Sequence, residues 1–310
     1  MKSTALSLAL ILGLALTPAP ASAAAAAPAA PAAPPPKDKE KVLKVTAVGR
    51  GVSMIEGDGG NIGVFASDEG VLIIDDQFAP LAPKLKAAIA RLSPKPVRLV
   101  VNTHWHPDHT GGNESFAIDG AAIIAHERAR NRLATAQVNR RGETVPPVPA
   151  KALPVITFDS DLRLHLGGEE IRVRHVPHAH TDGDSIVLFE KANVIHAGDT
   201  LFFNGYPFID TGTGGDVGGM IGASQFILEQ SDDFTRIIPG HGPLGGKAQV
   251  LEFHDMLVRV RDRVAKLIAQ KRTLNEVLDA KVTAEEDAKW GHGDIAAEIF
   301  ATSVFRSLVR

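Results

Sequence analysis

Residues 102–113 read Asn-Thr-His-Trp-His-Pro-Asp-His-Thr-Gly-Gly-Asn, and the fold predicted for the chain depends on this stretch. Three histidines and one aspartate stand within six consecutive residues. The preceding residues 97–101, Val-Arg-Leu-Val-Val, form a mostly apolar run that predicts a buried strand. Pro107 and the Gly111-Gly112 pair indicate that a loop follows. A rigid strand would therefore present four side chains that suit zinc or a similar divalent cation.

The spacing of the four side chains predicts two metal positions. His104 and His106 are two residues apart, so they point the same way in an extended segment. Asp108 and His109 follow Pro107, where the chain must turn, so they can face a second position. Two adjacent cations could accept all four side chains more readily than one. The alternative is a histidine-rich surface loop, but only 12 of the 310 residues are histidine, which makes a chance cluster improbable.

The composition predicts a globular protein of near-neutral charge. With 310 residues and 44% hydrophobic side chains, the chain can bury a sizeable core in one large domain or two small ones. The net charge of −3 and the lack of a basic cluster argue against a nucleic-acid partner, and a small-molecule substrate is expected. The chain has no cysteine, so it forms no disulfide.

Residues 1–23 read as a secretory signal peptide. A positive start precedes an apolar stretch at residues 5–16, which is too short to span a membrane with ordinary flanks. Small residues at 21–23 then form a cleavage signal. The alternative is an uncleaved anchor. We expect cleavage after Ala23, export to the periplasm or the extracellular space, and no stable membrane insertion afterwards.

An Ala/Pro-rich linker and a single domain are expected after the signal peptide. Residues 24–42 are dominated by Ala and Pro before a short charged run, and such a composition cannot build a packed core. From residue 43 the pattern changes to short apolar runs separated by Gly-rich breaks. We therefore assign residues 43–310 to one domain.

The apolar runs of this domain predict two groups of strands. The expected strands are 43–48, 52–55, 61–66, 71–74, 97–101, 121–125, 155–158, 162–166, 169–175, 185–189 and 194–197. The expected helices are 80–92, 126–138, 220–230, 248–269, 274–278, 284–289 and 294–308. Strands, then a helix and a strand, then strands again predict two packed sheets with helices outside. Asp75 and Asp76 end the fourth strand, and they could form a turn or brace a ligand loop.

Three further candidate ligands occur where later apolar runs give way to loops. They are His180, Asp199 and His241, and each has a glycine close by. Each residue alone is a weak signal, because a histidine in a loop usually has no such role. Their recurrence at three strand-to-loop junctions is what a site at one edge of a sandwich requires.

Aromatic residues cluster directly after Asp199. Phe202, Phe203, Tyr206 and Phe208 fall within seven residues of a chain that is only 5% aromatic. They could form a wall that contacts substrate, or they could pack locally beneath a long loop. The position beside a candidate ligand favours the substrate wall.

The ordered set of histidines and aspartates resembles the metallo-β-lactamase superfamily over residues 43–310. The resemblance implies an α+β fold, a four-layer αβ/βα sandwich. It also implies how the ligands are shared: a first metal held by His104, His106 and His180, a second held by Asp108, His109 and His241, and Asp199 bridging the two. Asp75 matches the early Asp of the family and would brace the metal loop. Thr181 and Asp184 are expected to hold the ligands in place without binding the metals themselves.

The same resemblance implies a secreted dinuclear zinc hydrolase, with iron or manganese as alternative metals. A metal-bound hydroxide would attack a polarised carbonyl, and Asp108 would orient this nucleophile as the catalytic residue. The lack of cysteine excludes the lactamase subclasses that use one as a ligand. The exported form and the aromatic loop favour a cyclic amide of the β-lactam kind, hence antibiotic breakdown, or an ester. A bridging aspartate such as Asp199, however, is more similar to the pattern in the thioesterases and lactonases of the superfamily.

Three alternatives to a lactam or ester hydrolase remain open. The first is a thioester hydrolase similar to glyoxalase II, although no basic cluster suited to glutathione is evident. The second is iron-dependent oxidation of a persulfide, since His and Asp ligands tolerate iron. The third is a non-catalytic zinc-binding module, but seven ligands exceed the four that a structural zinc site needs.

Overall fold

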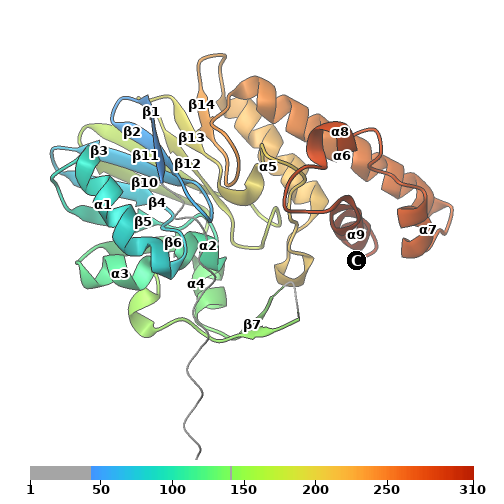
Figure 1. Ribbon diagram of the computed structural model, residues 1–310, viewed down its shortest axis with the longest axis horizontal. Coiled ribbons are helices and arrows are strands. Elements are labelled where there is room, and N and C mark those ends of the chain that lie inside the picture. The colour runs from blue at the N-terminus through green and yellow to red at the C-terminus, as the bar shows by residue number, and fades with distance from the viewer. Residues whose placement is uncertain (1–42, 140–141) are drawn as a thin grey trace, which may run out of the picture. The chain divides into compact units, whose positions relative to one another are not determined.

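The computed structural model describes residues 43–139 and 142–310. The predicted signal peptide and linker, residues 1–42, lie outside the described residues. Two β-sheets face each other, and helices cover the outer face of each sheet (Figure 1). The predicted four-layer αβ/βα sandwich is confirmed.

The first sheet has seven strands in the order β1-β2-β3-β4-β5-β6-β9, antiparallel up to β4 and parallel from there on. Its strands are β1 (Lys44–Gly49), β2 (Val52–Glu56), β3 (Ile62–Ser67), β4 (Gly70–Ile74), β5 (Val97–Val101), β6 (Ala122–His126) and β9 (Ile156–Phe158). Helices α1 (Ala82–Leu92) and α3 (Asn113–Ile118) contribute side chains to the core on its outer face.

The second sheet has five strands in the order β10-β11-β12-β13-β14. They are β10 (Asp161–Leu166), β11 (Glu169–His175), β12 (Ser185–Phe189), β13 (Val194–His196) and β14 (Arg236–Ile238). Its outer face is covered by α5 (Val217–Gln230) and α6 (Lys247–Ala269). Helix α9 (Ala297–Leu308) packs against both, and the short helices α7 (Leu274–Asp279) and α8 (Asp287–Trp290) lie nearby.

Side chains alternate between two cores along the buried strands. In β12, Val187 and Phe189 enter the core between the sheets, whereas Ile186 and Leu188 pack beneath the outer helices. Strand β4 behaves in the same way between the inter-sheet core and α1. Because both faces are covered, these strands are continuously apolar rather than alternating with polar residues. This is why short apolar runs in the sequence could be assigned to strands.

One predicted helix is corrected by the structure. Residues 126–138 were expected to be helical, but α4 (Glu127–Leu133) ends early and is followed by the short strand β7 (Gln137–Val138), which pairs with β8 (Thr144–Val145). The Gln137 amide donates to the Arg132 and Thr135 carbonyl oxygens, which stabilises a turn after the helix. Competition of this kind between side-chain amides and the helix backbone is not visible in apolar spacing.

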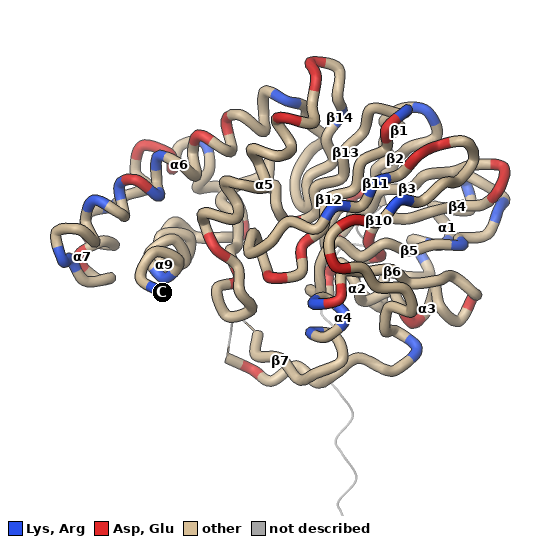
Figure 2. The backbone as a smooth tube through the Cα atoms, turned by 180° about the vertical axis from the view of Figure 1, so that it is seen from behind, with Lys and Arg blue, Asp and Glu red and all other residues tan. Residues whose placement is uncertain are grey.

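Acidic and basic residues are interspersed along the solvent side of α6 (Figure 2). Arg259 of this helix pairs with both oxygens of Glu286, just before α8, at 2.8 and 2.9 Å. Within residues 43–139 and 142–310, no helix combines the length and the hydropathy that crossing a bilayer requires.

We expect Phe189→Ala to lower the free energy of unfolding by roughly 3–5 kcal/mol, the usual loss for a fully buried phenylalanine. The ring is 1% exposed and lies 5.8 Å from that of Phe65 between the sheets. Chemical denaturation would measure the change. Phe234→Ala is the control, because Phe234 is 84% exposed and its loss should change stability little. Equal effects of the two substitutions would contradict the inter-sheet core.

Candidate metal centre

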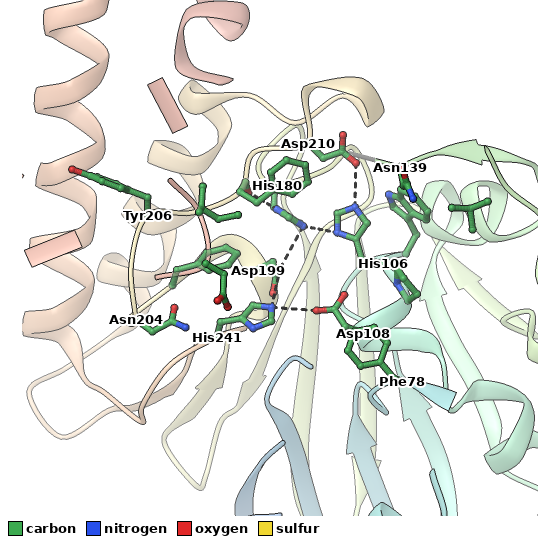
Figure 3. A pocket seen from close by; sticks show the side chains of 17 residues that line it. Phe78, His106, Asp108, Asn139, His180, Asp199, Asn204, Tyr206, Asp210 and His241 are labelled. Atoms are coloured by element: carbon green, nitrogen blue, oxygen red, sulfur yellow. Dashed lines mark hydrogen bonds and ion pairs between the residues drawn. The ribbon is translucent and has the colours of Figure 1, made fainter. Parts of the chain in front are cut away.

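The candidate ligands come from loops that follow four strands at one edge of the sandwich. The turn after β5 and the short helix α2 (Pro107–Thr110) carry the histidine-rich stretch. His180 lies between β11 and β12, Asp199 lies in the turn after β13, and His241 follows β14. Figure 3 shows several of these side chains pointing toward one another. The fold therefore brings together residues that are far apart in sequence.

The seven side chains form two groups. His104, His106, His180 and Asp199 each present one ligand atom within 4.8 Å of the others. The second group likewise consists of Asp108, His109 and His241. Asp199 touches both groups, because its Oδ2 atom lies 3.5 Å from His180 Nε2 and 3.4 Å from His241 Nε2. Such an arrangement could hold two adjacent cations with a shared carboxylate.

Hydrogen bonds behind the first group fix which ring nitrogens carry protons. Thr103 Oγ1 has one proton, which it donates to Asp75 at 2.7 Å, so His104 Nδ1, 3.0 Å from the same oxygen, must be the donor. His180 Nδ1 donates to the Phe208 carbonyl oxygen at 2.7 Å. In the neutral rings the other nitrogen, Nε2 in both cases, then carries a lone pair and no proton.

The remaining histidines of the stretch follow the same rule. His106 Nε2 faces Asp210 at 3.1 Å, and His109 Nδ1 faces Asp75 at 2.7 Å. Their opposite nitrogens, Nδ1 of His106 and Nε2 of His109, are therefore the free ones in the neutral rings. His106 Nδ1 lies only 3.1 Å from His104 Nε2 and 2.8 Å from His180 Nε2. Three lone pairs converge at this point, and a cation between them would turn their mutual repulsion into ligation.

Asp199 is also placed for cations rather than for hydrogen bonds. The residue is 5% exposed, and its Oδ1 atom is buried without a hydrogen bond, although it lies 3.1 Å from His109 Nε2. A buried carboxylate oxygen that accepts no hydrogen bond is costly, and a position beside a cation would compensate for it. Gly240 allows the approach, because a Cβ atom there would stand 2.0 Å from this oxygen. The residues present therefore fit a pair of divalent cations.

When no cation is bound, the surroundings lower the pKa values of His104 and His180 and raise those of His109 and His241. Burial lowers the pKa of His180 to about 4 and holds that of His104 well below its usual value. Although burial opposes it, Asp199 raises the pKa of His241 to about 9. The pKa of His109 is likewise raised, by Asp199, Asp108 and Asp75 against the effect of burial. Protons on His109 and His241 thus offset carboxylate charge that cations would otherwise balance.

Asp75 occupies the position expected of a brace. It is fully buried at the end of β4, in the left-handed region with φ 63°, and accepts from the Thr103 backbone N–H at 2.7 Å as well as contacting His109. Thr181 contacts Asp184 instead of a ligand: its N–H and hydroxyl donate to this carboxylate at 2.7 and 2.6 Å. Thr181 therefore shapes the His180 loop indirectly.

Asp210 is a functional residue that sequence reasoning missed. It orients His106, and it is itself held by the backbone N–H groups of Gly212 and Thr213 and by the Thr213 hydroxyl. An Asp followed by Thr-Gly is an ordinary turn sequence, so no local signal marks it. The same loop supplies the Phe208 carbonyl that orients His180.

A cavity of about 480 Å³ opens over the two groups of ligands. Its wall includes the predicted aromatic residues Phe202 and Tyr206, together with Trp105 and Phe208. The Phe202 ring stacks on His241 with centroids 5.2 Å apart. The cavity has the size of a small-molecule site.

Phe203 and Tyr206, two of the expected substrate contacts, differ in their position relative to the cavity. Phe203 is not among the residues that line the cavity, and its ring lies against Gly245, so its contact with substrate stays a prediction. Tyr206 reaches the wall, but its hydroxyl lies 2.8 Å from Asp287 Oδ1 and 3.2 Å from the Thr283 carbonyl oxygen. Its polar end therefore faces the C-terminal segment, and contact with substrate stays a prediction.

An αβ/βα sandwich with histidines and aspartates clustered at one edge defines a class of metal-dependent proteins. Residues 55–246 match the family described as the Metallo-beta-lactamase superfamily. The chain belongs to this superfamily, and the predicted family is confirmed.

Curated relatives align with a little less than half of the chain. The subunit alpha of 2,4-dinitroanisole O-demethylase from Nocardioides sp. is 30% identical over 138 residues, 44% of this chain and 39% of the relative. The cytoplasmic hydroxyacylglutathione hydrolase of Saccharomyces cerevisiae is 32% identical over 154 residues, 47% of this chain and 50% of the relative. The chain thus spans about half the length of these relatives or less.

Solved structures show the same fold at low identity. A metallo-beta-lactamase from Pontibacter korlensis superposes with a TM-score of 0.58 at 20% identity, covering 69% of this chain and 98% of that one. The sec-alkylsulfatase Pisa1 from Pseudomonas sp. gives a TM-score of 0.65 at 18% identity, covering 86% of this chain and 50% of that one.

We expect Asp210→Ala to weaken binding of the first cation by roughly 10- to 100-fold, because it removes the acceptor that orients His106. Asp210→Asn should restore most of the affinity, since an amide oxygen can still accept from Nε2. Competition with a chromogenic chelator would measure both. Asp262→Asn, on the exposed side of α6, is the matched control. An unchanged affinity in Asp210→Ala would contradict the role of this carboxylate.

Cation affinity should rise with pH up to about pH 9, where His241 of the metal-free protein loses its proton. Below that pH a cation must displace this proton, so the apparent affinity falls as the pH falls. Chelator competition at a series of pH values would measure the slope. His292→Gln, an exposed histidine outside the site, should leave the slope unchanged. A flat profile from about pH 6 to pH 9 would contradict a protonated His241.

Proposed function

We propose that this protein is a hydrolase that uses two divalent cations, with zinc as the resident metal, to cleave ester and thioester bonds. The convergence of unprotonated imidazole nitrogens on His106, opposite a second group of ligands, carries the proposal. We also propose that the protein is exported, because residues 1–23 read as a secretory signal peptide.

When bound, two such cations supply a water that ionises near neutral pH and a Lewis acid that polarises the carbonyl. The residues of the chain do the rest. Asp108 lines the cavity, and its neighbours His109 and His241 outweigh burial and lower its pKa to about 2. It therefore remains a carboxylate that can accept a hydrogen bond from the attacking water and orient this water toward the carbonyl carbon. Meanwhile Asp75 fixes the orientation of the His109 ring, and Asp210 fixes that of the His106 ring.

The aromatic wall has a separate task. Phe202, Phe208 and Trp105 give the cavity apolar surface beside the ligands. An acyl chain packed there would exclude bulk water from the reacting carbonyl and fix its orientation. Discrimination between substrates then depends on the wall, while the attack depends on the ligands.

Similarity to hydroxyacylglutathione hydrolases supports ester and thioester bonds over a cyclic amide. Those relatives are aligned at about 30% identity, whereas the solved lactamases, at 17% and 20%, share the fold alone. The lining gives no support for glutathione as the carrier, because none of its described residues is a lysine or an arginine that could bind the glutathione carboxylates. The expected β-lactam substrate is therefore tested beside the esters and thioesters.

Elemental analysis should find about two zinc ions per chain, as a two-metal site requires, and chelation should abolish hydrolysis of chromogenic esters and thioesters. His104→Ala and Asp199→Ala should each lose metal and reduce kcat/KM by at least about 100-fold, the scale of losing a ligand and its charge. A chromogenic β-lactam completes the panel. Full activity and full metal content in both variants would refute the proposal, and one iron per chain would favour redox chemistry.

A further inference from the structure

The cavity wall is completed by a segment outside the matched family region. The match ends at residue 246, yet Asp294 and Ile295 line the cavity beside the ligands. These two residues precede α9, in the stretch that follows α8. The surroundings of a bound substrate are therefore set partly by a segment on which the family match says nothing.

Close backbone contacts hold this segment over the site. The Tyr206 N–H donates to the Trp290 carbonyl oxygen at 3.0 Å. Gly205 and Gly293 lie against each other, since a Cβ atom on Gly205 would stand 2.7 Å from Gly293 Cα. The C-terminal segment is thus fixed to the aromatic loop, and Asp294 has a defined place at the wall.

The charge of the wall is one-sided among the residues that the structure describes. Four carboxylates line the cavity, and no lysine or arginine does. Asp108 and Asp199 belong to the ligand groups, and Asp210 is engaged with His106. Asp294 is exposed, and its side chain has no hydrogen bond or ion pair with another described residue. It is the one carboxylate of the wall that is free to meet a substrate.

We propose that Asp294 selects substrates that carry a positively charged nitrogen distant from the scissile bond, and that it disfavours substrates with a carboxylate at that end. This inference rests on the proposed hydrolase function. Phe202 in the same wall supports it, because the faces of aromatic rings attract cations and tolerate their apolar substituents. Asp294 would act as a specificity-determining residue that changes KM and leaves the attack on the carbonyl untouched.

The test uses the metal-loaded enzyme and three chromogenic esters that differ only at the end of the acyl chain. One ends in trimethylammonium, one in the uncharged tert-butyl group of the same shape, and one in carboxylate. We expect kcat/KM for the ammonium ester to exceed that for the tert-butyl ester by about two- to fivefold, the size of a partly exposed ion pair, mainly through KM. The carboxylate ester should be the poorest, and added salt should shrink the differences.

Variants separate the role of Asp294 from that of the remaining wall. Asp294→Asn should equalise the ammonium and tert-butyl esters, and Asp294→Lys should make the carboxylate ester the best of the three. Glu298→Gln is the control, because this exposed carboxylate on α9 lines a neighbouring hollow instead of the cavity. It should keep the wild-type order.

The outcomes distinguish this inference from the function on which it rests. Hydrolysis of all three esters at equal rates, or a preference for the carboxylate, would overturn the role of Asp294 and leave the hydrolase intact. Hydrolysis of none, by protein with full metal content, would refute the proposed esterase function. In that case calorimetry with two non-hydrolysable phenylalkyl compounds, one ending in trimethylammonium and one in carboxylate, would still test whether the trimethylammonium compound binds more tightly.

Discussion

The site depends on short distances between imidazole nitrogens that carry no proton in the neutral rings, distances that the fold imposes. Two of them lie 2.8 and 3.1 Å from His106 Nδ1, and in each neutral ring a hydrogen bond on the far side leaves the inward nitrogen without a proton. The acceptors are different in kind: a threonine hydroxyl, a backbone carbonyl and a carboxylate. Such an arrangement is unfavourable without a cation, so the surrounding fold must hold it in place.

The two packed sheets provide that rigidity. Asp75 leaves the buried end of β4, the histidine stretch leaves β5, and Asp199 and His241 leave the neighbouring strands β13 and β14 of the other sheet. The apolar layer between the sheets therefore fixes the distance between one half of the ligands and the other. Stability of this core and geometry of the site are consequently linked.

The ligands could be predicted from sequence because each stands at the end of an apolar run, where histidine and aspartate are conspicuous. Their neighbours could not be predicted in the same way. Asp210 lies 104 residues from His106, and its sequence context is that of a common turn. The Phe208 carbonyl has no side-chain signature at all. For the fold, strand positions followed from apolar runs, whereas the early end of α4 depends on the Gln137 amide, which hydrophobic spacing ignores. Asp294 was placed in a predicted helix, yet α9 begins only at Ala297.

The loop from Phe202 to Thr213 combines two tasks that could have been separate. It forms the aromatic wall of the cavity, and it carries both the carbonyl that orients His180 and the carboxylate that orients His106. Evolution of a new substrate range through this loop would disturb the histidines with almost every change of its backbone. None of the described residues after 246 makes a hydrogen bond, ion pair or ring contact with a ligand histidine, so the C-terminal segment is freer to vary. Diversification among close homologues would therefore concentrate after residue 246, where the surroundings of the substrate can change while the metal chemistry is inherited intact.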